Sequence, residues 1–136
     1  MIAQIIINLV KKRRKGNLTG FVIQKIFQVI RKIFLKIHKT ALIKYKLEKY
    51  EIILPLKHEL PIIKRDYPLY DTQIGRIVKY INEKYPSFQI IDIGANVGDS
   101  ATIIKSNVDL PILCIEADDY YYSLLLGNTK NFNNVV

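Results

Sequence analysis

The sequence predicts an α/β fold in which short parallel strands alternate with helices, preceded by a basic amphipathic helical leader. Three observations predict it. Apolar residues recur at helical spacing in the first part of the chain, short apolar runs alternate with helical segments in the second part, and the charge divides between the two. Residues 1–65 carry 16 Lys and Arg but three Glu, a net charge of +13, whereas residues 66–136 have a net charge of −4. We therefore divide the 136-residue chain into a basic helical region, residues 1–58, and an α/β domain, residues 59–136.

The composition and the N-terminal sequence exclude several classes of protein. Hydrophobic residues make up 49% of the chain, too many for a disordered polymer. The single cysteine excludes a disulfide framework and a cysteine-rich zinc module, and we expect no bound metal. No apolar run approaches the ~18 residues of a transmembrane helix. The apolar residues 2–10 precede the basic residues 11–15, the reverse of a secretory signal, so we expect a cytoplasmic protein whose membrane contact, if any, is peripheral.

The basic region is predicted to contain one long helix. Over residues 18–50, apolar side chains recur every three or four positions with lysines between them. Pro55 and Pro61 are predicted to end this pattern in a loop over residues 51–70. Three interpretations of the helix stay open: it packs on the α/β domain, it lies on an anionic membrane through residues 11–50, or it binds nucleic acid. The last is disfavoured because no recognised nucleic-acid-binding motif accompanies the charge.

The α/β half is predicted to alternate helices and strands. Asp71 is placed to cap its first helix and Asp118 to cap its last. Because both strands are almost continuously apolar, we expect the sheet to be buried on its two faces. The predicted elements are, in order, a helix over residues 72–84, a strand over 88–93, a helix over 99–106, a strand over 110–115, a helix over 119–130 and the beginning of a third strand at 135–136.

The loop after the first strand carries the most informative motif. The sequence Asp92-Ile-Gly-Ala-Asn-Val-Gly98-Asp99 begins where the strand ends, and doubly wound sheets bind ligands at the carboxyl ends of their strands. Its glycines permit positive φ and let a ligand approach the backbone closely. Glu116 ends the next strand 18 residues after Gly98, close to the spacing of ~20 residues at which an acidic residue bonds a ribose hydroxyl. The motif therefore predicts a cofactor that contains adenosine.

The charge of the loop decides between adenosine cofactors. A dinucleotide fingerprint has the spacing Gly-x-Gly-x-x-Gly, but Asn96 stands at the middle glycine position here. Asp92 and Asp99 flank the loop, and two carboxylates would repel a pyrophosphate. A P-loop is excluded because no Gly-Lys-Ser/Thr follows. Carboxylates suit a cofactor with cationic amino and sulfonium groups and no phosphate. This predicts S-adenosylmethionine, with an NAD-linked enzyme as a further alternative.

These motifs resemble the first two cofactor motifs of the FkbM-type S-adenosylmethionine-dependent methyltransferases. The resemblance rests on Asp92-Ile-Gly-Ala-Asn-Val-Gly98 and on Cys114-Ile-Glu-Ala-Asp118, and it covers roughly residues 60–136. It implies a Rossmann-like methyltransferase sheet, of which this chain would supply the first two strands and the beginning of the third. The resemblance therefore implies the N-terminal part of a truncated methyltransferase domain, which we expect to be inactive alone.

The resemblance also implies which residues hold the cofactor. Asp92 would orient its amino group, Glu116 would accept hydrogen bonds from the two ribose hydroxyls, and Asp118 would lie near the adenine edge. A helix cap explains Asp118 better than a ligand contact does, and Ala117 departs from the proline often found after this glutamate in the family. Four loop residues would line the methionine part of the cofactor: Gly94, Ala95, Asn96 and Gly98.

The function that the resemblance implies is S-adenosylmethionine-dependent O-methylation of a sugar hydroxyl in surface-polysaccharide biosynthesis. The acceptor would be a small molecule or a glycan. The catalytic base is left unassigned, because His38 in the basic helix and His58 in the predicted loop are poor candidates. The alternative from another class is a basic membrane-surface or scaffold module whose α/β half is vestigial.

Overall fold

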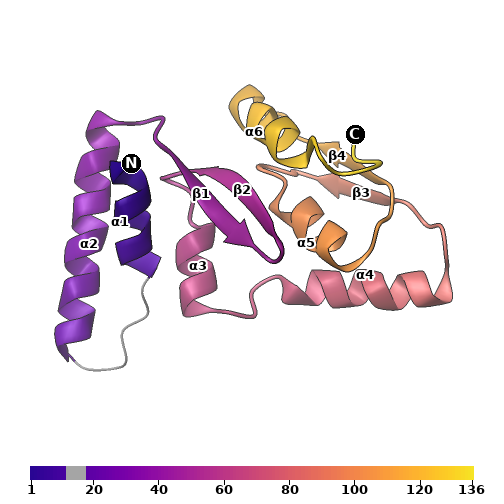
Figure 1. Cartoon of the computed structure of the whole chain (residues 1–136), viewed down its shortest axis with the longest axis horizontal. Helices are drawn as coiled ribbons and strands as arrows, with labels where there is room; N and C mark the ends of the chain where they lie inside the picture. The colour runs from indigo at the N-terminus through magenta and orange to yellow at the C-terminus, as the bar shows by residue number, and fades with distance from the viewer. Residues whose placement is uncertain (12–17) are drawn as a thin grey trace. The chain divides into compact units, whose positions relative to one another are not determined.

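The computed structural model describes residues 1–11 and 18–136, which form six helices and two sheets of two strands each, a mixed α/β fold (Figure 1). The basic residues 12–15 lie outside the described residues. In chain order the elements are α1 (Ile2–Lys11), α2 (Leu18–Ile37), β1 (Leu42–Leu47), β2 (Tyr50–Pro55), α3 (Leu60–Asp66), α4 (Thr72–Lys84), β3 (Ile90–Ile93), α5 (Asp99–Asn107), β4 (Ile112–Ile115) and α6 (Asp119–Thr129).

The chain divides into two compact units. Unit 1 consists of residues 1–44 and 54–70, and unit 2 consists of residues 45–53 and 71–136. The hairpin of β1 and β2 contributes residues to both units. The N-terminal half is therefore not the purely helical leader that the sequence predicts.

The predicted helix over residues 18–50 is wrong in its last third. The helix α2 ends at Ile37, and residues 42–55 form a hairpin. Buried and exposed side chains alternate along β1, which is the period of two of a half-buried strand. Apolar residues at a period of two also fall four positions apart, so their spacing in a short segment fits a helix as well. The buried residues of β1 are Ile43, Tyr45 and Leu47.

The predicted loop over residues 51–70 also contains regular structure. The strand β2 occupies its beginning, and the helix α3 follows. Pro61 lies in the first turn of α3, where its missing N–H is no loss and its fixed φ already suits a helix. The N–H of Tyr67 donates to the carbonyl of Ile63 (2.7 Å) at the end of this helix. Pro61 therefore begins a helix here, and the prediction that it ends one is wrong.

In unit 1, polar side chains fix both ends of α1, which packs against α2 and α3. The side-chain amide of Gln4 donates to the carbonyl of Lys44 (2.9 Å) and accepts from its N–H (2.8 Å). At the other end of α1, the Arg65 guanidinium donates to the carbonyl of Val10 (2.7 Å). The N–H and carbonyl groups of Lys44 in β1 and the carbonyl of Val10 at the end of α1 thereby obtain hydrogen-bond partners.

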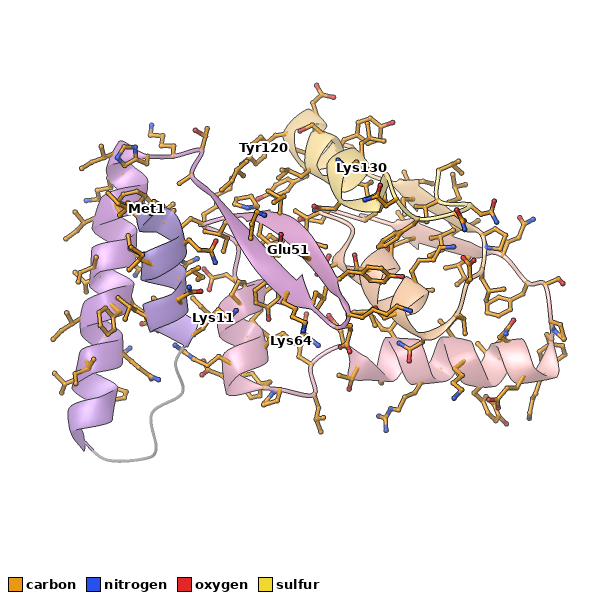
Figure 2. The ribbon with its side chains drawn as sticks, in the orientation of Figure 1. Met1, Lys11, Glu51, Lys64, Tyr120 and Lys130 are labelled. Carbon is orange, nitrogen blue, oxygen red and sulfur yellow. The ribbon has the colours of Figure 1, made fainter. Side chains whose placement is uncertain are left out.

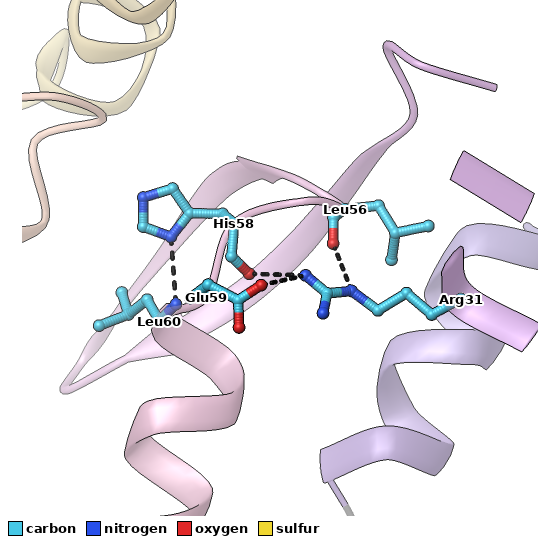
Figure 3. A network of polar contacts seen from close by, with 5 residues as sticks. All are labelled: Arg31, Leu56, His58, Glu59 and Leu60. Atoms are coloured by element: carbon cyan, nitrogen blue, oxygen red, sulfur yellow. Dashed lines mark hydrogen bonds and ion pairs between the residues drawn. The ribbon is translucent and has the colours of Figure 1, made fainter. Parts of the chain in front are cut away.

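A buried arginine fixes the rotation of α2 about its own axis (Figure 3). Arg31 is 6% exposed. Its Nε donates to the carbonyl of Leu56 (2.9 Å), and its Nη2 donates to the carbonyl of His58 (3.3 Å). The same Nη2 lies 3.2 Å from Oε1 of Glu59. The imidazole Nδ1 of His58 accepts the N–H of Leu60 (3.2 Å) at the start of α3. The side of α2 that carries Arg31 is therefore the side that faces the segment before α3.

Unit 2 contains the predicted alternation of helices and strands. The bounds of α4, α5 and α6 lie within one residue of those predicted, and β3 and β4 each begin two residues later than predicted. The two strands pair in parallel, with Asp92 beside Cys114. Ile112 also forms a parallel bridge with Val135. The strand β4 therefore lies between β3 and the segment predicted to begin a third strand.

The helices of unit 2 cover one face of this sheet. Val78 of α4, Ile104 of α5 and Leu125 of α6 belong to one buried cluster with Ile112 and Cys114 of β4. Within the described part of the chain the opposite face is uncovered. Its apolar side chains, each 44–79% exposed, are Ile91, Ile93, Leu113 and Ile115. The prediction that the sheet is buried on two faces is therefore wrong for this chain, because the three helices share one cluster.

Replacing Arg31 by alanine is expected to destabilise unit 1. The substitution leaves the carbonyls of Leu56 and His58 without their charged donor, and losing such hydrogen bonds costs about 3 kcal/mol. Hydrogen exchange of the full chain should show faster exchange in α2 and α3, with unit 2 unchanged. The matched control is Lys32→Ala, at the next and exposed position of the same helix, which should change stability by less than about 0.5 kcal/mol. Equal effects of the two variants would contradict this role of Arg31.

Candidate cofactor site

The loop between β3 and α5 is held against the end of β4 by its own main chain. Gly94, Asn96 and Gly98 have positive φ values of 77°, 51° and 80°, so the chain turns sharply. The N–H groups of Gly94 and Ala95 both donate to the carbonyl of Ile115 (2.8 and 3.0 Å). The N–H of Gly98 donates to the carbonyl of Ala95 (2.8 Å). The loop therefore closes over the carboxyl end of the parallel sheet, where such sheets bind ligands.

The Glu116 carboxylate joins this loop to the beginning of α6. Its Oε2 accepts the N–H of Asn96 (2.7 Å), and its Oε1 accepts the N–H of Asp118 (2.9 Å). An ionised carboxylate has about four acceptor positions, so about two remain after these bonds. Glu116 is thus brought beside the glycine loop and keeps acceptor capacity for a pair of hydroxyl groups.

Most N–H groups of the loop are used within the protein. A pyrophosphate site at a helix N-terminus needs such groups to point at the ligand. Here the loop leaves few donors for an anion and is flanked by the carboxylates of Asp92 and Asp99. This arrangement disfavours a ligand held through phosphate. The N–H groups that donate to oxygens of the protein are those of Gly94, Ala95, Asn96 and Gly98.

The two glycines of the loop differ in their surroundings. A Cβ atom on Gly98 would lie 2.9 Å from Cδ1 of Leu125 and 3.1 Å from Cγ2 of Thr129. A Cβ atom on Gly94 would meet no described atom within 4 Å. Gly98 is therefore required by the close approach of α6. Gly94 leaves open space at the end of β3.

Asp92 lies beside Cys114 in the parallel register and has an unusual environment. Burial raises the pKa of the Asp92 carboxyl, and the charge of Asp99 raises it further. Among the described residues, no group forms a hydrogen bond to its Oδ2 atom. Burial, and then the charge of Asp92, raise the pKa of the Cys114 thiol to about 11, so this thiol is protonated at neutral pH. The site therefore contains a half-buried carboxyl group, one oxygen of which has no hydrogen-bond partner among the described residues.

Asp118 acts as a helix cap. Its Oδ1 accepts the N–H groups of Tyr120 (3.0 Å) and Tyr121 (3.1 Å) at the start of α6. Asp71 differs, although it also stands at a helix N-cap: its backbone is left-handed, with φ 58°, and its side chain makes no capping hydrogen bond to a described residue. The predicted cap is therefore confirmed at Asp118 and wrong at Asp71, where the carbonyl accepts the N–H of Ile74 instead (3.1 Å).

Asn128 of α6 holds the other side of the loop, a role that sequence reasoning missed. Its Nδ2 donates to the carbonyls of Val97 (2.8 Å) and Ile53 (3.0 Å), and its Oδ1 accepts the N–H of Ile53 (2.7 Å). The bonds connect α6, the loop and the end of β2 within unit 2. Ile53 and Asn128 are 75 residues apart, so no local pattern in the sequence marks this pairing.

The structure thus brings together Asp92, the loop residues 94–98 and Glu116, with Asp118 bound to Glu116 through its main chain. The two histidines belong to unit 1. The imidazole of His58 accepts a hydrogen bond from the main chain of α3, and the ring centroids of His38 and Phe34 are 4.5 Å apart. Among the described residues, no group of three or more His, Cys, Asp or Glu is placed to hold a metal ion.

Comparisons of the chain with protein-family models, with curated proteins and with solved structures find no match.

Alanine substitutions at the two glycines should have different costs. Gly98→Ala adds a clash with Leu125 to an unfavourable positive φ, and we expect it to lower the free energy of unfolding by about 2–4 kcal/mol. Gly94→Ala has only the backbone cost of about 1 kcal/mol. Urea denaturation of the full chain, followed by circular dichroism, measures both. Equal losses in the two variants would mean that the space beside Gly94 is filled.

Replacing Asp92 by asparagine should stabilise unit 2 at neutral pH. Because the folded-state pKa of Asp92 is raised, this carboxyl favours the fold below its unfolded pKa of about 4, and that contribution is lost as the pH rises through the raised value. The thermal midpoint of Asp92→Asn should therefore exceed that of the wild type at neutral pH, and the difference should shrink on acidification. Asp119→Asn, an exposed first-turn residue of α6, is the control. A difference that does not change with pH would refute the assignment.

Proposed function

We propose that unit 2 is the cofactor-binding part of an S-adenosylmethionine-dependent O-methyltransferase. The observation that carries the proposal is the Glu116 carboxylate, which lies at the end of β4 and bonds the N–H of Asn96 in the glycine loop (2.7 Å). This is the arrangement expected of an acidic residue that accepts ribose hydroxyls beside a loop that holds the rest of the cofactor.

The residues of the site fit the parts of this cofactor. The open space beside Gly94 lets the methionine part approach the main chain without a clash. The remaining acceptor positions of Glu116 suit the two hydroxyls of a ribose. Asp92 would hold the amino group of the cofactor, which would donate a hydrogen bond to the Oδ2 atom that has no partner among the described residues. When bound, S-adenosylmethionine supplies a methyl group that is attached to a sulfonium sulfur. After transfer of the methyl group, this sulfur is a neutral thioether.

The sign of the charge at the loop supports this cofactor over a nicotinamide dinucleotide. Asp99 is close enough to Asp92 to raise its pKa, so the loop already concentrates negative charge. A sulfonium and an ammonium group are attracted to such a site, whereas a pyrophosphate is repelled. The loop N–H groups that would hold phosphate oxygens bond protein oxygens instead.

The acceptor part of the proposal is a sugar hydroxyl in surface-polysaccharide biosynthesis, and it comes from the resemblance of the motifs to the FkbM-type family. Transfer would form a bond between the methyl carbon and the acceptor oxygen while the bond to sulfur breaks, and the hydroxyl proton would pass to a base. The protein's main contribution to such a step is to hold the two groups in line. Among the described residues, β3 pairs with a strand on one side only. We therefore expect this chain alone to bind the cofactor weakly and to transfer no methyl group.

Substitution of Glu116 tests the proposal. The full chain, titrated with S-adenosylmethionine or S-adenosylhomocysteine and followed by NMR or isothermal titration, should bind with an affinity weaker than micromolar. Glu116→Gln should weaken this binding by about tenfold or more, because a hydrogen bond to a charged acceptor is lost. Asp119→Asn removes an exposed carboxylate three residues away and should leave the affinity unchanged.

Two results would contradict the proposal. One is an absence of binding by the folded wild type at millimolar cofactor. The other is tighter binding of a nicotinamide dinucleotide than of S-adenosylhomocysteine, with protection of the loop from proteolysis by the dinucleotide alone. Because Glu116→Gln also changes the partner of the Asn96 N–H, hydrogen exchange in the loop of this variant separates a lost ligand contact from a disordered loop.

A further inference from the structure

We propose that unit 1 docks on an anionic membrane surface through the outer side of α2, with the helix lying in the plane of the surface. The inference is independent of the cofactor site, because every residue that carries it belongs to unit 1. It rests on the orientation of α2, on the side chains that this orientation exposes, and on their charge.

The buried Arg31 decides which side of α2 faces outward. Successive residues of a helix are about 100° apart around its axis. Val22 lies nine residues before Arg31, and Val29 and Ile33 lie two residues on either side of it, so these three are about 160–180° from the buried guanidinium. Since Arg31 is held by the main chain of Leu56 and His58, the apolar side chains opposite it are turned to solvent. Figure 2 shows side chains projecting from α2 on the side away from α1.

The outward side of α2 is an apolar stripe of unusual length for a surface helix. A soluble helix normally buries its apolar side and exposes its polar one. Contiguous exposed apolar surface marks an interaction site. The residues of the stripe, each 42–73% exposed, are Val22, Ile26, Val29, Ile30, Ile33 and Ile37.

The stripe has lysines along one border and no acidic residue. Lys25, Lys32 and Lys36 are exposed, and they lie about 20–60° from the nearer edge of the stripe around the helix. The sequence of α2 contains no Asp or Glu. Lysines at the border of an apolar stripe can extend their charged ends to lipid phosphates while their stems lie along the apolar surface.

The apolar surface continues beyond the end of α2. A shallow groove of about 710 Å³ lies between the end of α2 and the beginning of α1. It is lined by exposed apolar side chains, among them Ile2, Ile37 and Leu42, and by His38 and Lys39. The contact surface therefore extends from α2 to the N-terminal turn of α1 and keeps its positive charge.

The charge of this surface selects the occupant. No described helix is both long enough and apolar enough to cross a membrane, so contact with lipid would be lateral. A second copy of the chain seated on the stripe would bring two rows of lysines together, which costs energy. A nucleic acid would use the lysines but leave the isoleucines in water. An anionic bilayer satisfies both the apolar stripe and its basic border.

The test is sedimentation of the full chain with vesicles of phosphatidylcholine, with and without phosphatidylglycerol. We expect binding to the anionic vesicles, weakened by salt, and little binding to the neutral ones. The triple variant Lys25→Gln, Lys32→Gln, Lys36→Gln should lose about fivefold in partition for each lysine. The control is a triple variant of exposed lysines from unit 2, which lowers the net charge equally and should change partition much less: Lys46→Gln, Lys79→Gln and Lys130→Gln.

A second pair of variants tests the apolar stripe. Ile33→Asn should weaken vesicle binding by about tenfold or more. Burial of an isoleucine side chain contributes about 1.5–3 kcal/mol, and about 1.4 kcal/mol corresponds to tenfold in the partition constant. Its matched control is Ile77→Asn on α4, since the two isoleucines are 56% and 54% exposed. Val29→Asn provides a second substitution in the stripe, and circular dichroism checks that each variant is folded.

Three results would overturn the proposal. The first is no binding of the folded wild type to anionic vesicles. The second is equal loss in the two lysine triples or in the two isoleucine variants, which would indicate diffuse charge rather than α2. The third is self-association in sedimentation velocity that Ile33→Asn abolishes, without vesicle binding, which would make a second copy the occupant. None of these results depends on whether the chain binds S-adenosylmethionine.

Discussion

The pairing of main-chain groups where helices and strands end is the constraint on which both units depend. A buried N–H or carbonyl group without a partner is costly, and the ends of short elements have many of them. In unit 2 these groups are paired by Glu116 and Asn128, and in unit 1 by Arg31 and Arg65. Each of these side chains reaches main chain at least 20 residues away. The loops of this protein are therefore shaped by single polar side chains supplied from other elements.

That constraint also determines the chemistry of the glycine loop. Because the loop N–H groups are used to hold the loop against β4 and Glu116, they cannot form the donor row of a phosphate site. The carboxyl groups of Asp92 and Asp99 lie close enough for the charge of Asp99 to raise the pKa of Asp92. A loop built in this way favours a cationic ligand, whereas a loop whose amides point outward favours an anionic one. The same glycine-rich pattern can thus bind either a cationic or an anionic ligand, depending on which acceptors its N–H groups bond.

The sequence predicts unit 2 better than unit 1, for a physical reason. In unit 2 the helix α4 has a clear apolar periodicity, and glycine or capping residues mark where α5 and α6 begin, so local pattern and tertiary packing agree, as at Asp118 and the loop that ends at Gly98. In the hairpin, whose residues belong to both units, Tyr45 and the lysines around it fit a helix and a strand alike over a few residues. The contacts of Asn128 with Ile53 and of Arg31 with Leu56 join segments 75 and 25 residues apart, and no local pattern encodes them. The assignment of the cofactor and of its residues stays a prediction.

The division of charge gives the two proposals a common consequence. An anionic surface that attracts residues 1–65, with their net charge of +13, repels residues 66–136, with their net charge of −4. The two proposed ligands, a cationic cofactor at the Asp92–Asp99 loop and an anionic surface at α2, therefore require opposite charges on the chain. Within a Debye length of about 10 Å at 0.1 M salt, an anionic surface would also concentrate cations near the protein. The separation of +13 in residues 1–65 from −4 in residues 66–136 thus suits the first part of the chain to an anionic partner and the second part to a cationic ligand.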